Sequence, residues 1–78
     1  MPLHNKIRYW RLQTGFQNLK DFAEIIGFSV WLVERWEQQK TQPTLEALCR
    51  IRERLLSYHP GITLDDLIDY IEPPENMD

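Results

Sequence analysis

The segment from Phe22 to Glu37 constrains the fold most, because its sequence predicts two helices joined by a very short turn. Gly27 lies where a chain leaving a helix often needs a positive φ angle, and Ser29 is a good N-cap for a second helix. Apolar residues recur through the segment with a helical period, at Phe22, Ile25, Ile26, Leu32, Val33 and Trp36. This order is typical of a helix-turn-helix, whose second helix can enter the major groove of DNA. An ordinary helical hairpin has the same spacing, so both interpretations stay open.

The length and composition of the chain favour one small domain. Its 78 residues can bury only a modest core. The single cysteine, Cys49, excludes an internal disulfide and fits a reducing compartment. No apolar run approaches the ~20 residues of a membrane span, and residues 1–6 lack the apolar segment of a signal peptide. We therefore expect a cytoplasmic protein.

The net charge of −3 is unusual for a nucleic-acid-binding protein, but the charges are unevenly distributed. Residues 1–54 contain all nine Lys and Arg residues and six acidic residues, which gives +3. Residues 55–78 contain six acidic residues and no Lys or Arg, which gives −6. This asymmetry indicates an interaction surface followed by an acidic tail. A solvated acidic C-terminus without a partner is the other interpretation.

Helical spacing predicts five helices in all. The first three cover residues 5–14, 19–26 and 30–38, and Asn5 and Asn18 cap the first two. Thr44 caps a fourth helix, in which Cys49 is expected as a small buried thiol beside an inner face of Leu45, Leu48, Ile51 and Leu55. Thr63 caps a fifth helix, whose apolar stripe is Leu64, Leu67, Ile68 and Ile71. We therefore expect a compact all-α domain of five helices over residues 1–72, followed by a disordered acidic tail over residues 73–78.

These elements resemble the Cro/C1-type (Xre-like) helix-turn-helix domains of phage repressors and bacterial regulators. The resemblance runs from Asn5 to Ile68 and rests on five stretches that follow in the family's order. They are Asn5-Lys6-Ile7-Arg8 with Arg11 and Gly15, Phe22 to Ser29, Val33 to Glu37, Lys40 with Pro43-Thr44-Leu45, and Gly61 to Leu67. The resemblance implies a lambda repressor-like fold of five helices. It also implies that the third helix lies in the major groove and that the protein binds DNA as a homodimer.

The resemblance further implies roles for individual residues. Arg11 and Glu37 match an internal ion pair that joins the first helix to the third. Residues of the third helix match positions that face the major groove, and Lys40 with its loop neighbours matches phosphate contacts. Lys20, with Arg8 and the amides at helix N-termini, is expected to hold further phosphates. The candidate DNA-binding residues are Asn18, Lys20, Ser29, Val30, Trp31, Glu34, Arg35, Lys40, Thr41 and Gln42.

The third helix departs from the family at both of its ends. Val30 and Trp31 stand where the family usually carries side chains that hydrogen-bond to base edges, and Gln39 stands where it usually has glycine. Because Val33 and Trp36 define the inward face, helical geometry turns Val30 and Trp31 toward solvent. An exposed pair of this kind contacts either DNA or a protein, which includes a second copy of the chain. Burial in the core is the third alternative.

No pattern in the sequence predicts catalysis. His4, Cys49 and His59 lack metal-ligand spacing, and the acidic residues after Thr63 lack the loop of a calcium site. No Gly-rich phosphate loop is present, so we expect no enzyme activity, cofactor or metal. The preferred interpretation is a transcriptional regulator, and more specifically a repressor, that binds double-stranded DNA as a homodimer. The fifth helix and its acidic extension are the candidates for the dimer surface. The alternative is a protein–protein interaction module on the same fold, which presents Val30 and Trp31 to a polypeptide.

Overall fold

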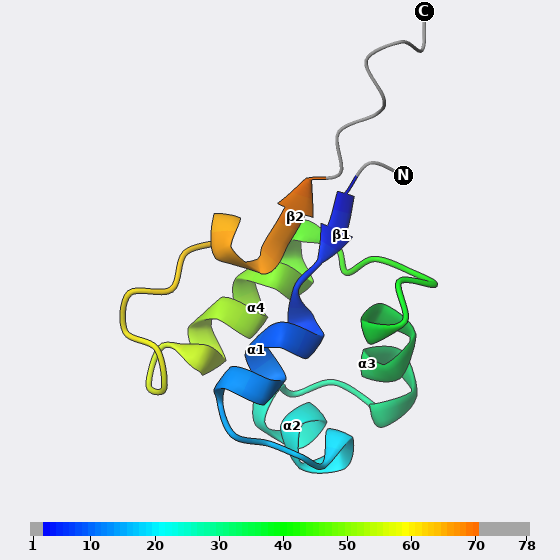
Figure 1. The fold of residues 1–78 in the computed structure, drawn as a ribbon, viewed down its shortest axis with the longest axis horizontal. Helices are drawn as coiled ribbons and strands as arrows, with labels where there is room; N and C mark the ends of the chain where they lie inside the picture. The colour runs from blue at the N-terminus through cyan, green and yellow to red at the C-terminus, as the bar shows by residue number, and fades with distance from the viewer. Residues whose placement is uncertain (1–2, 71–78) are drawn as a thin grey trace, which may run out of the picture.

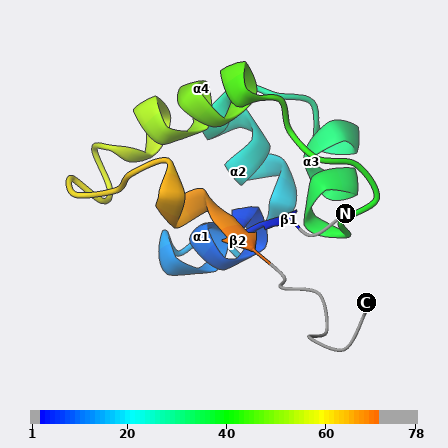
Figure 2. The same cartoon turned by 90° about the horizontal axis from the view of Figure 1, so that it is seen from above.

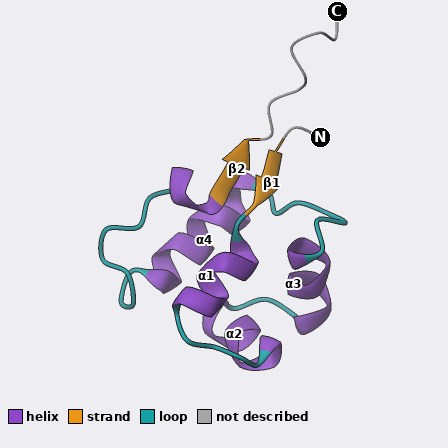
Figure 3. Ribbon diagram, viewed as in Figure 1, coloured by secondary structure: helices purple, strands orange, loops and turns teal. Residues whose placement is uncertain are grey.

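The computed structural model describes residues 3–70, which form a helical domain with a small sheet at one end (Figure 1). The helices are α1 (Ile7–Gln13), α2 (Leu19–Ile26), α3 (Val30–Glu37) and α4 (Leu45–Leu55), and a short 3₁₀ turn, η1 (Asp65–Leu67), follows them. The strands β1 (Leu3–Asn5) and β2 (Ile68–Tyr70) come from the two ends of the described segment and pair antiparallel (Figure 3). Of the helices in this segment, none is long and apolar enough to cross a membrane.

The expected all-α fold of five helices is wrong, because the fifth helix is replaced by η1 and β2. Thr63 does begin the turn as predicted, since its N–H donates to Asp66 Oδ2 at 2.9 Å while Asp66 N–H donates to Thr63 Oγ1 at 3.3 Å. The helical path then ends at Ile68, whose backbone is extended at φ −125° and ψ 140°. Residues 3–70 therefore form four α-helices and a two-stranded sheet. Ile71 of the predicted apolar stripe, the predicted domain boundary at residue 72 and the predicted tail over residues 73–78 lie outside the described residues.

Pairing with β1 explains why the chain leaves the helical path. Leu3 lies opposite Tyr70 and Asn5 lies opposite Ile68. The ladder continues beyond the strands, because Lys6 N–H donates to the carbonyl of Leu67 at 2.8 Å. An isoleucine and a tyrosine on alternate positions of β2 suit a pleated strand at least as well as a helix. The sheet thus satisfies backbone groups that a fifth helix would have satisfied within itself.

Asn5 does not cap α1 as predicted, because it belongs to β1 and Lys6 occupies the cap position. Its Oδ1 still accepts a hydrogen bond from Ile7 N–H at 3.1 Å, two residues along the chain, which is the spacing expected of a cap bond from Asn5. The side chain is buried, and its Nδ2 donates to the carbonyl of Trp36 at 2.8 Å and to Gln42 Oε1 at 2.9 Å. Asn5 therefore joins the sheet to the loop that follows α3.

The core collects apolar side chains from every helix and from the segment that leads into the sheet. Helix α2 packs against both α3 and α4, and α1 packs against α3. Figure 2 shows α2 between α4 and α1. The buried apolar residues are Ile7, Phe22, Ala23, Ile26, Val33, Trp36, Ala47, Leu48, Ile51, Leu55, Ile62 and Leu67. Large side chains of this kind each stabilise the fold by about 1.5–3 kcal/mol when fully buried.

Helix α4 begins where predicted, and three of its four residues predicted to face inward, Leu48, Ile51 and Leu55, are buried. Thr44 caps it, because its Oγ1 accepts from Ala47 N–H at 3.1 Å. Leu45, predicted to be inward, is 68% exposed, and Cys49, predicted to be a buried thiol, is exposed as well. At 3.6 residues per turn, Leu45 lies about a third of a turn away from Ile51, which is fully buried. The actual apolar stripe is therefore narrower than the leucine spacing indicates.

Candidate nucleic-acid interface

Helices α2 and α3 form a helix-turn-helix unit whose turn is closed by local hydrogen bonds. Gly27 ends α2 with φ at +83°, a left-handed conformation that glycine adopts most readily. The N–H groups of Gly27 and Phe28 both donate to the carbonyl of Ala23, at 2.9 and 3.1 Å. Ser29 Oγ then accepts from Leu32 N–H at 3.2 Å and begins α3. The glycine turn and the serine cap that the sequence predicts are both present.

The inner face of α3 fixes the rotation of this helix about its own axis. Val33 is completely buried, and Trp36 is 3% exposed. The ring of Phe28 lies edge-on against the Trp36 indole, with the ring centroids 5.0 Å apart and the planes at 70°. Rotation of the helix would expose both buried side chains at a cost of about 1.5–3 kcal/mol each. The opposite face of α3 is therefore held toward solvent.

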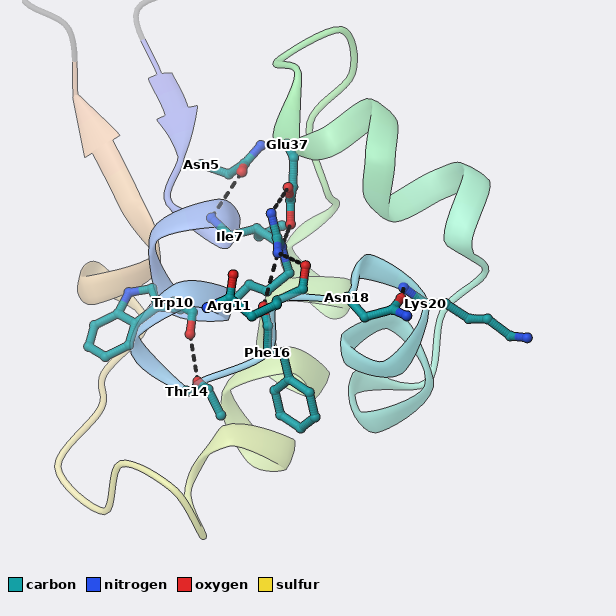
Figure 4. Close-up of polar contacts among 10 residues, drawn as sticks. Asn5, Ile7, Trp10, Arg11, Thr14, Phe16, Asn18, Lys20 and Glu37 are labelled. Carbon is teal, nitrogen blue, oxygen red and sulfur yellow. Dashed lines mark hydrogen bonds and ion pairs between the residues drawn. The ribbon is translucent and has the colours of Figure 1, made fainter.

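The C-terminal end of α3 is joined to α1 by the ion pair that the family resemblance implies. Arg11 Nε donates to Glu37 Oε2 at 2.7 Å, and Arg11 Nη2 donates to Glu37 Oε1 at 3.2 Å. The two side chains are 11% and 8% exposed. Arg11 Nη1 also donates to the carbonyls of Phe16 and Gln17, at 3.0 and 3.1 Å (Figure 4). One guanidinium group thus links α1, the loop after it and α3, and its two-point contact fixes the direction of α3.

Val30, Trp31, Glu34 and Arg35 form what we call the α3 outer face. Val30 is 40% exposed and Trp31 is 66% exposed, which excludes both from the core and confirms the prediction that they face solvent. Glu34 is exposed and Arg35 is half-buried. The guanidinium carbon of Arg35 lies 5.2 Å from the centre of the Trp31 ring, a cation–π contact between residues one helical turn apart.

The start of α2 contributes a helix cap and an exposed cation. Asn18 Oδ1 accepts from Lys20 N–H at 2.7 Å. Both side chains are exposed, and Figure 4 shows Lys20 extending away from the helix. No ion pair of Lys20 is found within residues 3–70. Ser29 is exposed at the start of α3. The N-terminal ends of both helices therefore offer amide groups that can contact phosphates.

The loop after α3 supplies fewer DNA-facing groups than the sequence predicts. Lys40 is exposed, as a phosphate contact requires. Gln42, however, donates from Nε2 to Gln39 Oε1 at 3.0 Å and accepts at Oε1 from Asn5 Nδ2 at 2.9 Å. Thr41 Oγ1 is buried and has no hydrogen-bond partner among residues 3–70. Because the side-chain polar groups of Thr41 and Gln42 point into the domain, only Lys40 offers its side chain to a phosphate from this loop.

Gln39 has a structural role, because its side chain forms hydrogen bonds with the backbone of β1. The φ angle of Gln39 is +61°, a left-handed conformation that glycine adopts most readily. Gln39 Oε1 accepts from Asn5 N–H at 3.2 Å, and Gln39 Nε2 donates to the Asn5 carbonyl at 3.0 Å. The side-chain amide therefore pairs with the backbone of β1 much as a neighbouring strand would. The glutamine in place of glycine is the one signal of this role in the sequence.

Comparison of the chain with protein-family models, curated proteins and solved structures finds no match. The Cro/C1-type resemblance therefore stays a prediction. Within residues 3–70, no group of three or more His, Cys, Asp or Glu side chains is placed to hold a metal ion. The arrangement that offers a binding surface is the α3 outer face with the lysines beside it.

Two arginines of α4 lie beside the helix-turn-helix, although the sequence pattern does not assign them to the interface. The guanidinium carbon of Arg50 lies 5.3 Å from the centre of the Phe28 ring. Arg54 Nη2 would lie 3.7 Å from a Cβ atom placed on Gly27. Both arginines are exposed. The positive balance of residues 1–54 signals such a contribution, but only the fold shows that these two cations lie next to the turn.

Proposed function

We propose that this protein binds double-stranded DNA with α3 in the major groove and acts as a transcriptional regulator, specifically a repressor. The observation that carries the proposal is the α3 outer face, which is exposed while buried Val33 and Trp36 hold the helix from below. An α-helix fits the major groove, and side chains on its outward face reach base edges there. A domain lodged in the groove excludes other proteins from the same DNA, which favours repression.

Phosphate contacts in this proposal come from both ends of the helix-turn-helix. Lys20 is exposed at the start of α2, and Lys40 is exposed after the end of α3. Such cations and the amides at helix N-termini position a protein on DNA without reading its sequence. The cations lie in the part of the chain that carries +3, whereas the acidic residues of the C-terminal part are remote in sequence.

We propose that the protein binds as a homodimer and that the sheet takes the place of the fifth helix in the dimer surface. Leu3 and Tyr70, which pair at the outer end of the sheet, are 39% and 58% exposed. A mostly apolar cavity of about 160 Å³ is lined by Leu3, and Pro43, Leu48 and Ile68 also contribute to its lining. A second copy would cover these apolar groups. Sedimentation equilibrium should then give twice the 9.4 kDa of one chain, and Tyr70→Asp should shift the mass toward a single chain. A single-chain mass for the unmodified protein at all concentrations contradicts the dimer.

A cytoplasmic location agrees with this proposal. Cys49 is exposed on α4, and it is the only cysteine of the chain. An exposed single thiol persists in a reducing compartment, whereas an oxidising one favours its pairing with another molecule. Labelling with a thiol reagent immediately after lysis tests the reduced state, and a disulfide-linked dimer in cells would contradict it.

Fluorescence anisotropy with a pool of random-sequence duplexes tests DNA binding directly. The duplexes should be about 24 base pairs long, which accommodates two half-sites one helical turn apart. Each phosphate that a cation neutralises steepens the salt dependence of the binding constant by about 0.9 logarithmic units. Each substitution removes two cations from a homodimer, so Lys20→Ala and Lys40→Ala should each reduce this slope by about two units. Lys6→Ala is the matched control, because Lys6 lies over the Tyr9 ring on α1 and should leave the slope unchanged.

Trp31→Ala separates the interface from the fold. Because the indole is 66% exposed, the free energy of unfolding should change by less than about 0.5 kcal/mol, while DNA binding weakens. Absence of binding by micromolar protein at about 50 mM salt would refute the DNA-binding proposal.

A protein–protein interaction module is the second candidate, and the apolar start of α3 favours it. Val30 and Trp31 offer large apolar surface and only one hydrogen-bond donor, the indole N–H, whereas base edges are read mainly through hydrogen bonds. A polypeptide partner could bury both side chains. Loss of the salt-dependent DNA signal together with Trp31-dependent binding of a defined partner protein would support this function over the first.

A further inference from the structure

The α3 outer face combines one side chain that has several hydrogen-bond donors with an apolar surface. This combination restricts the set of DNA sequences that the face can recognise. Arg35 is the only cation on the face, and Val30 and Trp31 supply the apolar groups. Asn and Gln, which recognise adenine through two hydrogen bonds, are absent from α3. Which bases this face selects depends on the proposed DNA binding.

The contact between Arg35 and Trp31 prepares the guanidinium for recognition. The guanidinium carbon lies 5.2 Å from the centre of the indole ring, and no ion pair of Arg35 is found within residues 3–70. The ring therefore restricts the guanidinium while leaving its hydrogen-bond donors for a ligand. A planar fork of donors matches the O6 and N7 acceptors of guanine, which is the commonest base-specific contact in the major groove.

The spacing along α3 places the apolar groups over a base pair one or two steps from this guanine. Residues one turn apart, such as Trp31 and Arg35, are separated by about 6 Å along the helix axis. Successive base pairs rise by about 3.4 Å, so one helical turn spans one to two steps. The feature of the major groove that apolar side chains recognise is a methyl group on pyrimidine C5.

We infer that the α3 outer face selects DNA in which a pyrimidine with a C5 methyl group, either thymine or 5-methylcytosine, stands one or two base pairs from a guanine. Arg35 donates to the guanine, while Val30 and the exposed edge of Trp31 cover the methyl group. Trp31 acts twice in this arrangement, because it also holds the Arg35 guanidinium. The apolar start of α3 is then a specificity element rather than a defect in the reading surface.

Selection from a random duplex pool, followed by sequencing of the bound fraction, gives the first test. The enriched duplexes should contain thymine one or two base pairs from guanine above the frequency in the starting pool. The best duplex is then remade with deoxyuridine in place of the selected thymidine, which removes one methyl group and nothing else. Burial of a single methyl group corresponds to about a fourfold change in affinity, so binding should weaken about fourfold per half-site.

Two further duplexes distinguish the sources of the methyl group. The selected T·A pair is replaced by a C·G pair, with and without a methyl group on cytosine C5. Recovery of affinity on methylation supports recognition of the methyl group in both bases. Affinity that stays low with 5-methylcytosine, combined with discrimination of thymine from uracil, assigns the methyl contact to thymine.

Variants of the protein test the methyl contact and the guanine contact separately. Trp31→Ala should bring the thymine-to-uracil affinity ratio close to one, and Arg35→Lys should reduce the preference for guanine while the ratio persists. Lys20→Ala is the matched control, because it should weaken binding to all duplexes equally. DNA binding without any thymine–uracil discrimination overturns this inference and leaves the proposed function intact. Absence of binding to every duplex at about 50 mM salt overturns both.

Discussion

Glu37→Leu is the most direct test of the contact that sets the direction of α3. The substitution keeps a side chain of similar size but removes both acceptors of Arg11, at Oε1 and Oε2. The guanidinium would then stay 11% exposed with Nε and Nη2 unpaired. Removing one partner of a buried ion pair typically costs about 3–5 kcal/mol, because the other charge is left without compensation.

The expected loss lies near the lower end of that range. Arg11 Nη1 keeps its two bonds to the carbonyls of Phe16 and Gln17, at 3.0 and 3.1 Å. We therefore expect Glu37→Leu to lower the free energy of unfolding by about 3 kcal/mol. A chain of this size is stable by only about 4–12 kcal/mol. In a domain of this length, a loss of 3 kcal/mol corresponds to a fall in Tm of about 12–24 °C.

Urea unfolding followed by far-ultraviolet circular dichroism measures this loss. Glu34→Leu is the matched control, because Glu34 is an exposed carboxylate on the same helix and should change stability by less than about 0.5 kcal/mol. The double variant Arg11→Met/Glu37→Leu leaves no unpaired charge. It should therefore be more stable than the sum of the single losses predicts, by about 2 kcal/mol.

Either of two results would refute this account of the ion pair. A loss below about 1 kcal/mol for Glu37→Leu would match a solvent-exposed pair rather than a buried one. Additive single losses in the double-variant cycle would show that Arg11 and Glu37 contribute independently. The direction of α3 would then have to be set by its buried apolar face alone.

Three further substitutions test the loop, the cap and the helix face. Gln39→Ala should lose about 1–3 kcal/mol in urea unfolding, because the side chain makes four hydrogen bonds, three to Asn5 and one to Gln42. Gln39→Gly should lose about 1 kcal/mol less, because glycine tolerates the positive φ. Equal stability of both variants and the original would contradict this role. Ser29→Ala should lower the free energy of unfolding by about 0.5–2 kcal/mol through loss of the helix cap. Ser57→Ala, at an exposed serine, should lower it by less than about 0.5 kcal/mol, and equal effects of the two substitutions would contradict the cap. Leu48→Ala should lower the free energy of unfolding by about 2–5 kcal/mol, whereas Leu45→Ala should be nearly neutral because Leu45 is 68% exposed. A larger loss for Leu45→Ala than for Leu48→Ala would show that Leu45 faces the core, as the sequence predicts.

The helix-turn-helix could be predicted from sequence because its determinants are local. The glycine at the end of α2, the serine cap and the period of the apolar residues all act within a few residues of one another. The outward direction of Val30 and Trp31 follows from the same period once Val33 and Trp36 are taken as inward. The Arg11–Glu37 pair is not local, and only the family resemblance pointed to it.

The sheet could not be predicted from local patterns, because β2 depends on a partner near the other end of the chain. The capping box between Thr63 and Asp66 is real, and the spacing of Leu64, Leu67 and Ile68 fits a helix. Local preference therefore favoured a helix that tertiary pairing overrides after one turn. The same limit applies to Gln39 and Gln42, whose bonds to Asn5 join residues more than 30 positions apart in the sequence.

The candidate interface has few hydrogen-bonding side chains, because several polar side chains near the end of α3 are used in hydrogen bonds within the domain. Gln39 and Gln42 are engaged by Asn5, and Glu37 is engaged by Arg11, so their polar groups are directed inward. These bonds hold α3 at its C-terminal end. A reading surface with few hydrogen-bonding groups discriminates between sequences only if those groups have a fixed direction. Under the proposed DNA binding, we therefore expect variants that loosen this network, such as Gln39→Ala, to lose sequence discrimination before they lose affinity for DNA. The proposed lysine–phosphate contacts would tolerate a small rotation of α3, whereas the proposed base contacts would not.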